Sequence, residues 1–339
     1  MPVHSDPSLP SSVVNSIVFR LKTREKFTNE TKKNTMLGMD IVKLRPATKD
    51  NPWGGSKLIA AGKETSSSIL AECWELSFHP DGLCLVDSGP DRGKYLRDVA
   101  TDADKGKLCK KFPEFPILIK LIDAEANLSV QVHPNDDYAK KVEHDLGKTE
   151  MWHIISAEPG AGLYVGFRRE TTKDEILFAL ANNSIMDLLN FVEVKEGDTF
   201  FIPAGTVHAI GKGVTLIEIQ ESSNITYRLY DYGRMVNGKP RALNVDKALE
   251  VLNTSAYEQK KAQGTVLGKC KYFVCWKEDE NSPVVKASKD SFLCISFLKG
   301  QGTVNGIPFK ALDTFFVPAG SEARITGHSY QYVLTGIPR

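Results

Sequence analysis

The sequence lacks an excess of charge of either sign. Its 339 residues include 43 Lys and Arg and 42 Asp and Glu, which leaves a formal net charge of +1. Without a strongly basic or acidic balance, nothing in the composition attracts nucleic acid or a membrane surface. We therefore expect no nucleic-acid partner and no membrane partner, and any anionic ligand must be held by a local cluster of cations.

Cysteine is scarce, and long apolar runs are missing. The six cysteines form no Cys-x-x-Cys pair, and the two that lie closest, Cys270 and Cys275, would point to opposite faces of a strand. We interpret the cysteines as reduced core thiols. No apolar run approaches the roughly 18 residues of a membrane span, and the N-terminus lacks the pattern of a signal peptide. These features predict a soluble, cytoplasmic protein.

The first 35 residues differ in composition from the rest of the chain. They combine Ser, Pro and Thr with a basic cluster over residues 20–33. This composition predicts a mobile N-terminal extension, with a nucleic-acid arm or a targeting segment as the alternative.

Short strand-forming runs dominate the remaining sequence. They are rich in β-branched and aromatic residues, are separated by Gly, Pro, Asp and Asn, and include "ECWELSFHP", "FPILIKLID", "NLSVQVHP", "EMWHIISA" and "VTLIEIQ". Many short strands with such turns indicate a sandwich or a jelly-roll barrel. The predicted fold class is therefore mainly β.

One helical stretch interrupts the strands near residues 171–191. It opens with Thr172, and Glu175 three residues later completes the pattern of a capping box. Apolar residues then recur at helical spacing. We interpret this stretch as a small helical insertion beside a barrel, and we predict a second helix near residues 244–253 that leads to a second barrel.

A near-repeat points to that second barrel. Residues 198–208 read "DTFFIPAGTVH" and residues 313–323 read "DTFFVPAGSEA", which indicates a duplicated strand and turn. The shared glycine allows the turn unusual backbone angles, and the shared proline ends the ladder of hydrogen bonds. The copies differ in one residue type that binds metal, because Ala323 stands where the first copy has His208.

Polar side chains fall on strand faces that packing would make apolar. Alternation along "SVQVHP" places Ser129, Gln131 and His133 on one face and two valines on the other. Lys148 and Glu150 share a face in "GKTEMWHI" in the same way. Two such polar stripes indicate a functional interior.

The chain offers a ligand set for zinc or a similar divalent ion. His133, Glu150 and His208 provide two imidazoles and one carboxylate, a set used by catalytic zinc with one position left open. Gln131 can supply a fourth, weaker oxygen. The alternative is that Glu150 only pairs with Lys148 and that the histidines are exposed.

Arg228 marks a further polar stripe, in "SSNITYRLYDYGR", where it alternates with apolar neighbours. The guanidinium fork suits a phosphate or an anionic intermediate, because it donates two parallel hydrogen bonds. The alternative is an ion pair of Arg228 with Asp231 or with another surface acid.

These motifs together resemble the type I mannose-6-phosphate isomerases, zinc enzymes of the cupin superfamily, in their short bacterial form. The resemblance rests on "FPILIKLIDAEANLSVQVHPND", "GKTEMWHIISAEPGAGLYVGF", "FIPAGTVHAIGKG" and "EIQESSNITYRLYDYGR", with "NPWGGSKL" near the start. It covers residues 40–235 densely and the C-terminal part loosely. Several long motifs in the family's order are more specific than a single cupin match.

The resemblance implies a fold, a reaction and a site. The fold is two cupin-like jelly-roll barrels: a catalytic metal-binding domain over residues 36–240 and a C-terminal domain without a metal site over residues 241–339. The reaction interconverts mannose 6-phosphate and fructose 6-phosphate through an enediol, so the expected partner is a small sugar phosphate. The site contains one Zn²⁺ per chain and the following residues: the zinc ligands His133, Glu150 and His208 with Gln131 as the fourth, Arg228 as the catalytic arginine, and Ser129 and Lys148 as contacts to the substrate.

Two other functions remain open from the sequence. A different metal-dependent cupin enzyme, such as another sugar isomerase or an oxygenase, would share His133, Glu150 and His208 without needing Lys148 and Arg228. A nonenzymatic sugar-binding cupin would be expected to lose its metal ligands.

Overall fold

The computed structural model describes residues 38–258 and 264–339. The predicted N-terminal extension, residues 1–35, lies outside the described residues. Within the described residues, no helix combines the length and the apolar character needed to cross a membrane. The chain from Met39 to Arg339 forms one compact unit.

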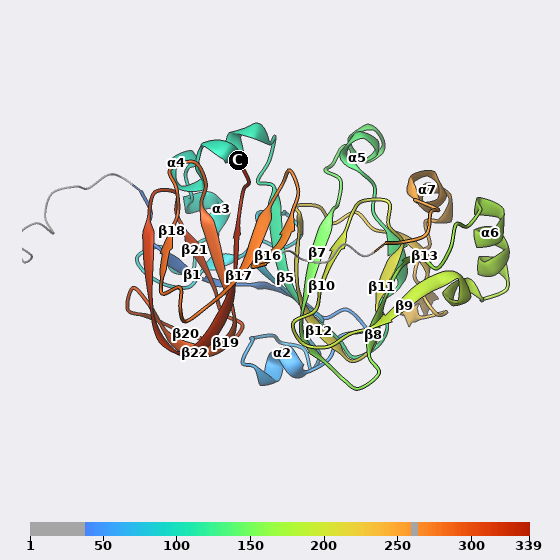
Figure 1. Ribbon diagram of the computed structural model, residues 1–339, viewed down its shortest axis with the longest axis horizontal. Coiled ribbons are helices and arrows are strands. Elements are labelled where there is room, and N and C mark those ends of the chain that lie inside the picture. Colours follow the sequence, from blue (N-terminus) through green and yellow to red (C-terminus); the bar gives the residue numbers. More distant parts are fainter. Residues whose placement is uncertain (1–37, 259–263) are drawn as a thin grey trace, which may run out of the picture. The chain divides into compact units, whose positions relative to one another are not determined.

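Two antiparallel sheets face each other and form the first barrel (Figure 1). One contains, in spatial order, β10 (Thr199–Ile202), β7 (Glu150–Ala157), β12 (Val214–Glu221), β5 (Ile117–Ala124), β3 (Glu72–Leu76) and β2 (Ala47–Lys49). The other contains β13 (Tyr227–Tyr230), β6 (Val130–Val132), β11 (His208–Ile210), β8 (Gly162–Phe167) and β9 (Leu189–Glu193). Apolar side chains from both sheets, among them Trp152, Leu163 and Leu216, fill one part of the space between them. The mainly β class predicted from the sequence is confirmed.

Helices cover the outer face of the five-stranded sheet. The helix α6 (Lys173–Ala181) begins with the predicted capping box, in which Thr172 and Glu175 exchange hydrogen bonds. The helical stretch is shorter than 171–191, because α6 is followed by the 3-10 turn η2 (Ile185–Leu188) and the chain then enters strand β9. The second predicted helix is α7 (Val245–Val251), which shares an apolar cluster with β6, β13 and α6.

A nine-stranded sheet forms the second half of this unit. Its spatial order is β16 (Val266–Lys269), β17 (Val274–Asp279), β22 (Glu322–Gly336), β19 (Leu293–Val304), β21 (Thr314–Val317), β1 (Val42–Arg45) and β4 (Leu85–Val86), with β18 (Val284–Lys286) beside β22 and β20 (Ile307–Lys310) beside β19. An aromatic-rich core, with Phe297 stacked on Phe309, lies along β18 to β22. Two strands of this sheet, β1 and β4, come from the N-terminal part of the chain, and the predicted division at residue 240 remains a prediction.

The connections carry the remaining short elements. They are the helices α2 (Lys57–Ala60), α3 (Leu96–Val99), α4 (Asp102–Lys105) and α5 (Asp136–Val142), the 3-10 turn η1 (Lys107–Lys111), and a hairpin of β14 (Met235–Val236) and β15 (Lys239–Pro240).

The two copies of the repeated phrase have the same local structure. Asp198 and Asp313 each accept a hydrogen bond from the backbone N–H three residues earlier, at 2.9 and 2.8 Å. Gly205 and Gly320 have φ angles of +86° and +83°, which favour glycine. In both turns the residue after this glycine donates its N–H to the carbonyl of the proline, at 3.1 and 3.0 Å. The residues shared by the two copies therefore maintain the same turn geometry in both.

An apolar layer joins the two halves of the unit. The outer face of the six-stranded sheet contributes Met151 and Ile219, and the C-terminal strands contribute Cys275 and Phe316. Phe292 is fully buried in this layer, with its ring centroid 5.0 Å from that of Phe115 and 5.2 Å from that of Phe316. The C-terminal sheet therefore completes the core on which the strands of the first barrel lie.

A polar contact lies at the edge of this junction. Asp136 on α5 receives a hydrogen bond from the Tyr272 hydroxyl and an ion pair from Lys271 at 2.8 Å. The nearby Glu221 is 1% exposed, and its Oε1 accepts the N–H of Thr149 at 3.2 Å. Burial, and then the negative charge of Asp136, raises the pKa of Glu221 to about 9.

Replacement of Phe292 by alanine should destabilise the whole unit. Loss of a buried phenyl ring costs about 3–5 kcal/mol, and we expect the free energy of unfolding to fall by this amount in a denaturant titration. Phe178→Ala on α6 is the matched control, since Phe178 is 71% exposed. A Phe292→Ala protein as stable as the Phe178→Ala protein would contradict the role of the junction.

Replacement of Glu221 by glutamine should change how stability depends on pH. The folded-state pKa of about 9 lies above the ordinary 4.5, so the stability linked to this proton is fully present below pH 4.5 and declines as pH rises towards 9. Glutamine cannot ionise. We therefore expect the stability of Glu221→Gln relative to the parent to grow between pH 5.5 and 8.5, by at most about 1.4 kcal/mol per pH unit.

Denaturant titrations at three pH values measure this change. Glu125→Gln serves as the control, because the Glu125 side chain is 55% exposed. Parallel pH profiles of Glu221→Gln and the parent would disprove the linkage.

Candidate metal centre and substrate pocket

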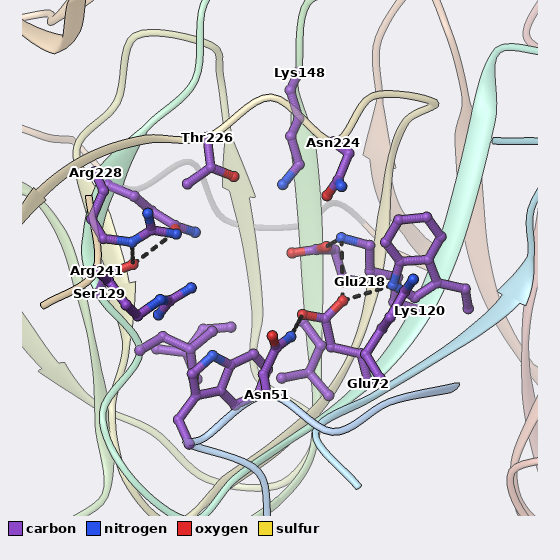
Figure 2. A pocket seen from close by; sticks show the side chains of 17 residues that line it. Asn51, Glu72, Lys120, Ser129, Lys148, Glu218, Asn224, Thr226, Arg228 and Arg241 are labelled. Atoms are coloured by element: carbon purple, nitrogen blue, oxygen red, sulfur yellow. Dashed lines mark hydrogen bonds and ion pairs between the residues drawn. The ribbon is translucent and has the colours of Figure 1, made fainter. Parts of the chain in front are cut away.

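A pocket of about 450 Å³ opens between the two sheets of the first barrel, and Figure 2 shows the side chains that line it. Four residues predicted for the site line this pocket: Ser129, Gln131, Lys148 and Arg228. The three predicted metal ligands do not line it, but Gln131 and Lys148 contact them. The structure thus brings all seven predicted residues into one region.

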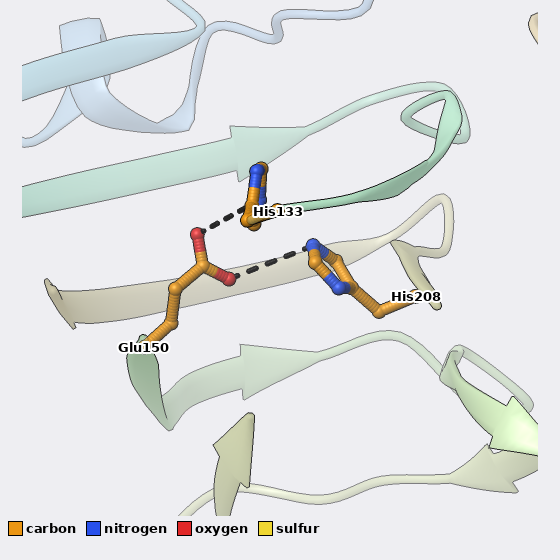
Figure 3. Close-up of side chains that lie close together, drawn as sticks. All are labelled: His133, Glu150 and His208. Atoms are coloured by element: carbon orange, nitrogen blue, oxygen red, sulfur yellow. Dashed lines mark ion pairs between the residues drawn. The ribbon is translucent and has the colours of Figure 1, made fainter. Parts of the chain in front are cut away.

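The three predicted ligands converge from three strands (Figure 3). His133 follows β6, Glu150 begins β7 and His208 begins β11. His133 Nε2 lies 3.3 Å from Glu150 Oε1, and His208 Nε2 lies 3.6 Å from Glu150 Oε2. None of the three is more than 2% exposed, which excludes the alternative of surface histidines.

Backbone carbonyls fix both imidazoles in one orientation. His133 Nδ1 is 2.7 Å from the carbonyl oxygen of Ile225, and His208 Nδ1 is 2.9 Å from that of Thr206. A carbonyl can only accept, so Nδ1 carries the proton in each ring and the Nε2 lone pair is directed at the carboxylate. Burial, and then the charge of Lys148, lowers the pKa of His133 to about 3, and burial lowers the pKa of His208. Both rings are therefore neutral, as metal ligation requires.

Glu150 is ionised although it is buried. Burial raises the pKa of a carboxyl group, but the Lys148 ammonium outweighs it, so the pKa of Glu150 lies well below its usual value. Lys148 Nζ is 2.7 Å from Glu150 Oε1. This contact is an ion pair without hydrogen-bond alignment, and neither Glu150 oxygen accepts a hydrogen bond from the described residues.

The cluster fits a divalent metal ion. One ionised carboxylate and two neutral Nε2 atoms lie within 4.8 Å of one another, and this is the sole such group of three found in residues 38–258 and 264–339. Lys148 pairs with Oε1 alone, so Oε2 of this buried carboxylate has neither a hydrogen-bond donor nor a cation among the described residues, which is costly unless a further cation binds. The donor set is two histidine nitrogens and one carboxylate, which suits zinc and related ions.

Gln131 stands beside the cluster. It is the cross-strand partner of His208, and its Nε2 lies 3.4 Å from His208 Nε2. Its Oε1 accepts a hydrogen bond from the Ser129 hydroxyl at 3.2 Å. A half-turn of the amide group would direct Oε1 at an ion between the histidines. The neighbouring valines, Val130 and Val132, are buried in the apolar cluster on the other face, as the alternation predicts.

Arg228 is oriented by neutral groups. Its Nε donates to Ser129 Oγ at 3.1 Å and its Nη1 donates to the carbonyl of Ala242 at 3.1 Å. Asp231 instead pairs with Arg234 at 3.2 Å and with Arg241 at 3.4 Å. The alternative of an ion pair between Arg228 and Asp231 is therefore wrong. Ser129 connects the arginine to Gln131 and so to the metal cluster.

Sequence reasoning missed a second charged group in this pocket. Lys120 on β5 and Glu218 on β12 are cross-strand partners, with Nζ and Oε1 3.2 Å apart, and both are buried. Glu218 Oε2 accepts the indole N–H of Trp152 at 2.7 Å. Burial, and then the charge of Glu150, raises the pKa of Glu218. The available signal was a charged residue in the middle of each apolar run, Lys120 in "FPILIKLID" and Glu218 in "VTLIEIQ".

Other histidines lie apart from the cluster. His153 is on the opposite face of β7 from Glu150, and its Nδ1 lies 2.8 Å from the Thr199 hydroxyl. His79 Nδ1 accepts the N–H of Asp81 at 3.1 Å. In the second half of the unit, Ala323 is buried against Val285, its cross-strand partner, in an apolar core. No metal ligands surround it among the described residues of that core.

Comparison with known proteins gives one consistent result. Residues 41–156 match the family of the type I phosphomannose isomerase catalytic domain. The chain is 37% identical over 304 residues to the mannose-6-phosphate isomerase ManA of Bacillus subtilis, which covers 84% of this chain and 96% of the relative.

Solved structures agree with this relationship. The crystal structure of the mannose 6-phosphate isomerase from Bacillus subtilis has a TM-score of 0.78 at 30% identity and covers 88% of this chain and 99% of its own. A zinc-bound mannose 6-phosphate isomerase has a TM-score of 0.71 at 15% identity, covers 89% of this chain and 100% of its own, and shows likeness of fold. The chain belongs to the type I mannose-6-phosphate isomerase family.

Proposed function

We propose that this protein is a metal-dependent isomerase that interconverts mannose 6-phosphate and fructose 6-phosphate through an enediol. The observation that carries the proposal is the ionised Glu150 between two neutral imidazoles, next to a pocket that contains Lys148 and Arg228. Relatives named mannose-6-phosphate isomerase, 37% and 36% identical, support the same reaction. The small sugar-phosphate substrate fits a cytoplasmic enzyme.

The metal is one Zn²⁺ per chain, held by His133, Glu150 and His208 with Gln131 as the fourth ligand. With Gln131 as the fourth ligand, a water molecule or a substrate oxygen would bind as a fifth, a coordination number that catalytic zinc can adopt. A divalent ion bound there supplies electrophilic stabilisation of negative charge that develops on the sugar oxygens.

The chain's own side chains perform the proton transfer and the positioning. Isomerisation moves a proton between C1 and C2 of the sugar, so a group that can hold a proton near neutral pH is needed. We assign Glu218 and Lys148 to this step, because both side chains line the pocket. The raised pKa of Glu218 suits a group that accepts and returns a proton.

Arg228 and Ser129 orient the substrate. Arg228 is the catalytic arginine: its Nη2 makes no hydrogen bond to the described residues and is available to an oxygen on which negative charge develops. Ser129 and Lys148 contact the sugar phosphate. In this proposal residues 36–240 carry the chemistry, and residues 241–339 support the first barrel through the apolar junction.

Replacement of His208 by alanine should remove the metal and the activity together. Purified parent protein should contain about one equivalent of zinc by mass spectrometry, since three protein ligands fix one ion. We expect His208→Ala to contain little zinc and to lose isomerisation of mannose 6-phosphate, and chelation of the parent should do the same. His153→Gln, which changes a histidine outside the cluster, should retain both. Full activity after exhaustive chelation would contradict the proposal.

Replacement of Arg228 by alanine should affect the reaction and leave the metal in place. Arg228 is connected to the proposed metal ligands only through Ser129, which donates a hydrogen bond to Gln131. Zinc content and Tm should therefore stay near those of the parent. Loss of a group that stabilises developing charge should lower kcat by a factor on the order of 100. Steady-state kinetics on mannose 6-phosphate measure this loss. An unchanged kcat with a higher KM would restrict Arg228 to substrate binding.

A further inference from the structure

A single carboxylate holds the segment that carries Lys148. Asp136 lies at the start of α5, three residues after His133. Its Oδ1 accepts the backbone N–H of Gly147 at 3.0 Å, and the next N–H, that of Lys148, donates to the carbonyl of Pro134 at 3.0 Å. The segment that leads into β7 is therefore hydrogen-bonded to the segment that follows His133.

Gly147 allows this close contact. A Cβ atom at position 147 would lie 2.5 Å from the backbone nitrogen of Asp136 and 2.6 Å from the carbonyl carbon of Asn135. A residue with a side chain would push the two backbones apart, so glycine is required here. The position of the Lys148 backbone thus depends on how firmly Asp136 itself is held.

Asp136 is held by two residues of the C-terminal half. Its Oδ2 accepts a hydrogen bond from the Tyr272 hydroxyl and pairs with Lys271 Nζ at 2.8 Å. Both residues lie in the turn between β16 and β17, and Figure 1 shows β16 beside β7. Burial raises the pKa of Asp136, but the hydrogen bonds from Lys271 and Tyr272 outweigh it and lower the pKa to about 2. Asp136 is therefore ionised at neutral pH, and its hydrogen bonds are charge-assisted.

Of these two residues, Tyr272 is the stronger anchor. It is 6% exposed and belongs to the apolar layer between the two halves. The Lys271 side chain is 65% exposed, and an exposed ion pair contributes little to stability. The hydroxyl of Tyr272 therefore connects Asp136 to the packed junction.

Lys148 is the side chain that this connection places. Its Nζ lies 2.7 Å from Glu150 Oε1 and 3.3 Å from His133 Nε2. Figure 2 shows it among the side chains that line the pocket. A shift of the Lys148 backbone would move the ammonium away from both groups, and a misplacement of about 1 Å can slow a reaction by about 100-fold.

We propose that Tyr272 is a positioning residue for the isomerase reaction, which acts through Asp136 to hold Lys148 in the pocket. The C-terminal half thus controls the geometry of the site through one hydroxyl group, in addition to supporting the first barrel by apolar packing. The inference rests on the proposed function for the part that Lys148 plays in the reaction. The placement of Lys148 itself can be measured without turnover.

The first test measures the accessibility of Lys148 in the zinc-loaded protein without substrate. Lys148 and Lys120 are each 4% exposed, so both should react slowly with acetic anhydride when acetylation is followed by peptide mass spectrometry. Tyr272→Phe retains the ring and loses the hydroxyl. We expect it to raise the rate at Lys148 by at least about threefold, because the segment opens more often. The rate at Lys120 should not change, since Lys120 is held by Glu218.

The second test measures the reaction. We expect kcat/KM for mannose 6-phosphate to fall by roughly 5- to 30-fold in Tyr272→Phe, because part of the strength of a charge-assisted hydrogen bond is lost at Lys148. A double-mutant cycle with Asp136→Ala identifies the route. In that background, which lacks the acceptor, loss of the Tyr272 hydroxyl should change kcat/KM by less than about twofold. Asp136→Asn takes its place if Asp136→Ala is poorly folded by its Tm, and additive losses in the cycle would contradict the route through Asp136.

Tyr332→Phe is the matched control. Tyr332 is fully buried in the core along β18 to β22, and its hydroxyl donates to the carbonyl of Ser282 at 2.7 Å. This variant also loses one hydroxyl group and one hydrogen bond, so a general loss of stability would appear in it as well. The rate of Lys148 acetylation and kcat/KM should stay at the values of the parent.

The outcomes distinguish this inference from the proposed function. A Tyr272→Phe protein with the parent's kcat/KM, or with the parent's rate of Lys148 acetylation, would overturn the positioning role. Equal increases at Lys148 and Lys120, or an equal increase in Tyr332→Phe, would overturn it too. A parent protein in which Lys148 acetylation depends on Tyr272 but which fails to isomerise mannose 6-phosphate would overturn the proposed function and leave the connection between Tyr272 and Lys148 standing.

Discussion

The site depends on one buried carboxylate that remains charged. Glu150 is fully buried, which by itself favours the neutral acid, yet the ammonium of Lys148 beside Oε1 keeps its pKa low. Its Oε2 has no cation beside it among the described residues, and the two Nε2 lone pairs aimed at the carboxylate complete a donor set for a divalent ion. The surrounding strands therefore position a buried charge that would be unfavourable in a purely apolar barrel interior.

The duplicated turn shows how one fold supports two different interiors. The aspartate and the proline accept equivalent hydrogen bonds in both copies, and the glycine has nearly the same φ angle. The difference lies in the side chains that the turn presents: His208 meets Gln131 across the strand pair, whereas Ala323 meets Val285. The first interior is polar at one end, and the second is filled by aromatic rings. The second half contributes to the first through the apolar layer that contains Phe292.

Charge is divided within the pocket in a way that suits a sugar phosphate. Near the metal cluster each lysine is matched by a carboxylate, as in the pair of Lys120 and Glu218. At the edge of the pocket, Asp231 pairs with Arg234 and Arg241, whereas Arg228 has no carboxylate partner among the described residues. The first arrangement balances the buried charges of Lys120 and Glu218, while the second leaves positive charge at the edge of the pocket.

The sequence by itself determined the mainly β class, the capping box at Thr172, the duplicated turn and the alternation that separates Gln131 from Val130 and Val132. Each depends on the spacing of residues that lie close together in the sequence, or on the residue types of a single turn. Only the tertiary structure decided how strands distant in sequence pair, as when β1 joins the C-terminal sheet or Lys120 meets Glu218 across β5 and β12. Those contacts depend on register between separate segments, and the excess charge around Asp231 likewise arises from packing.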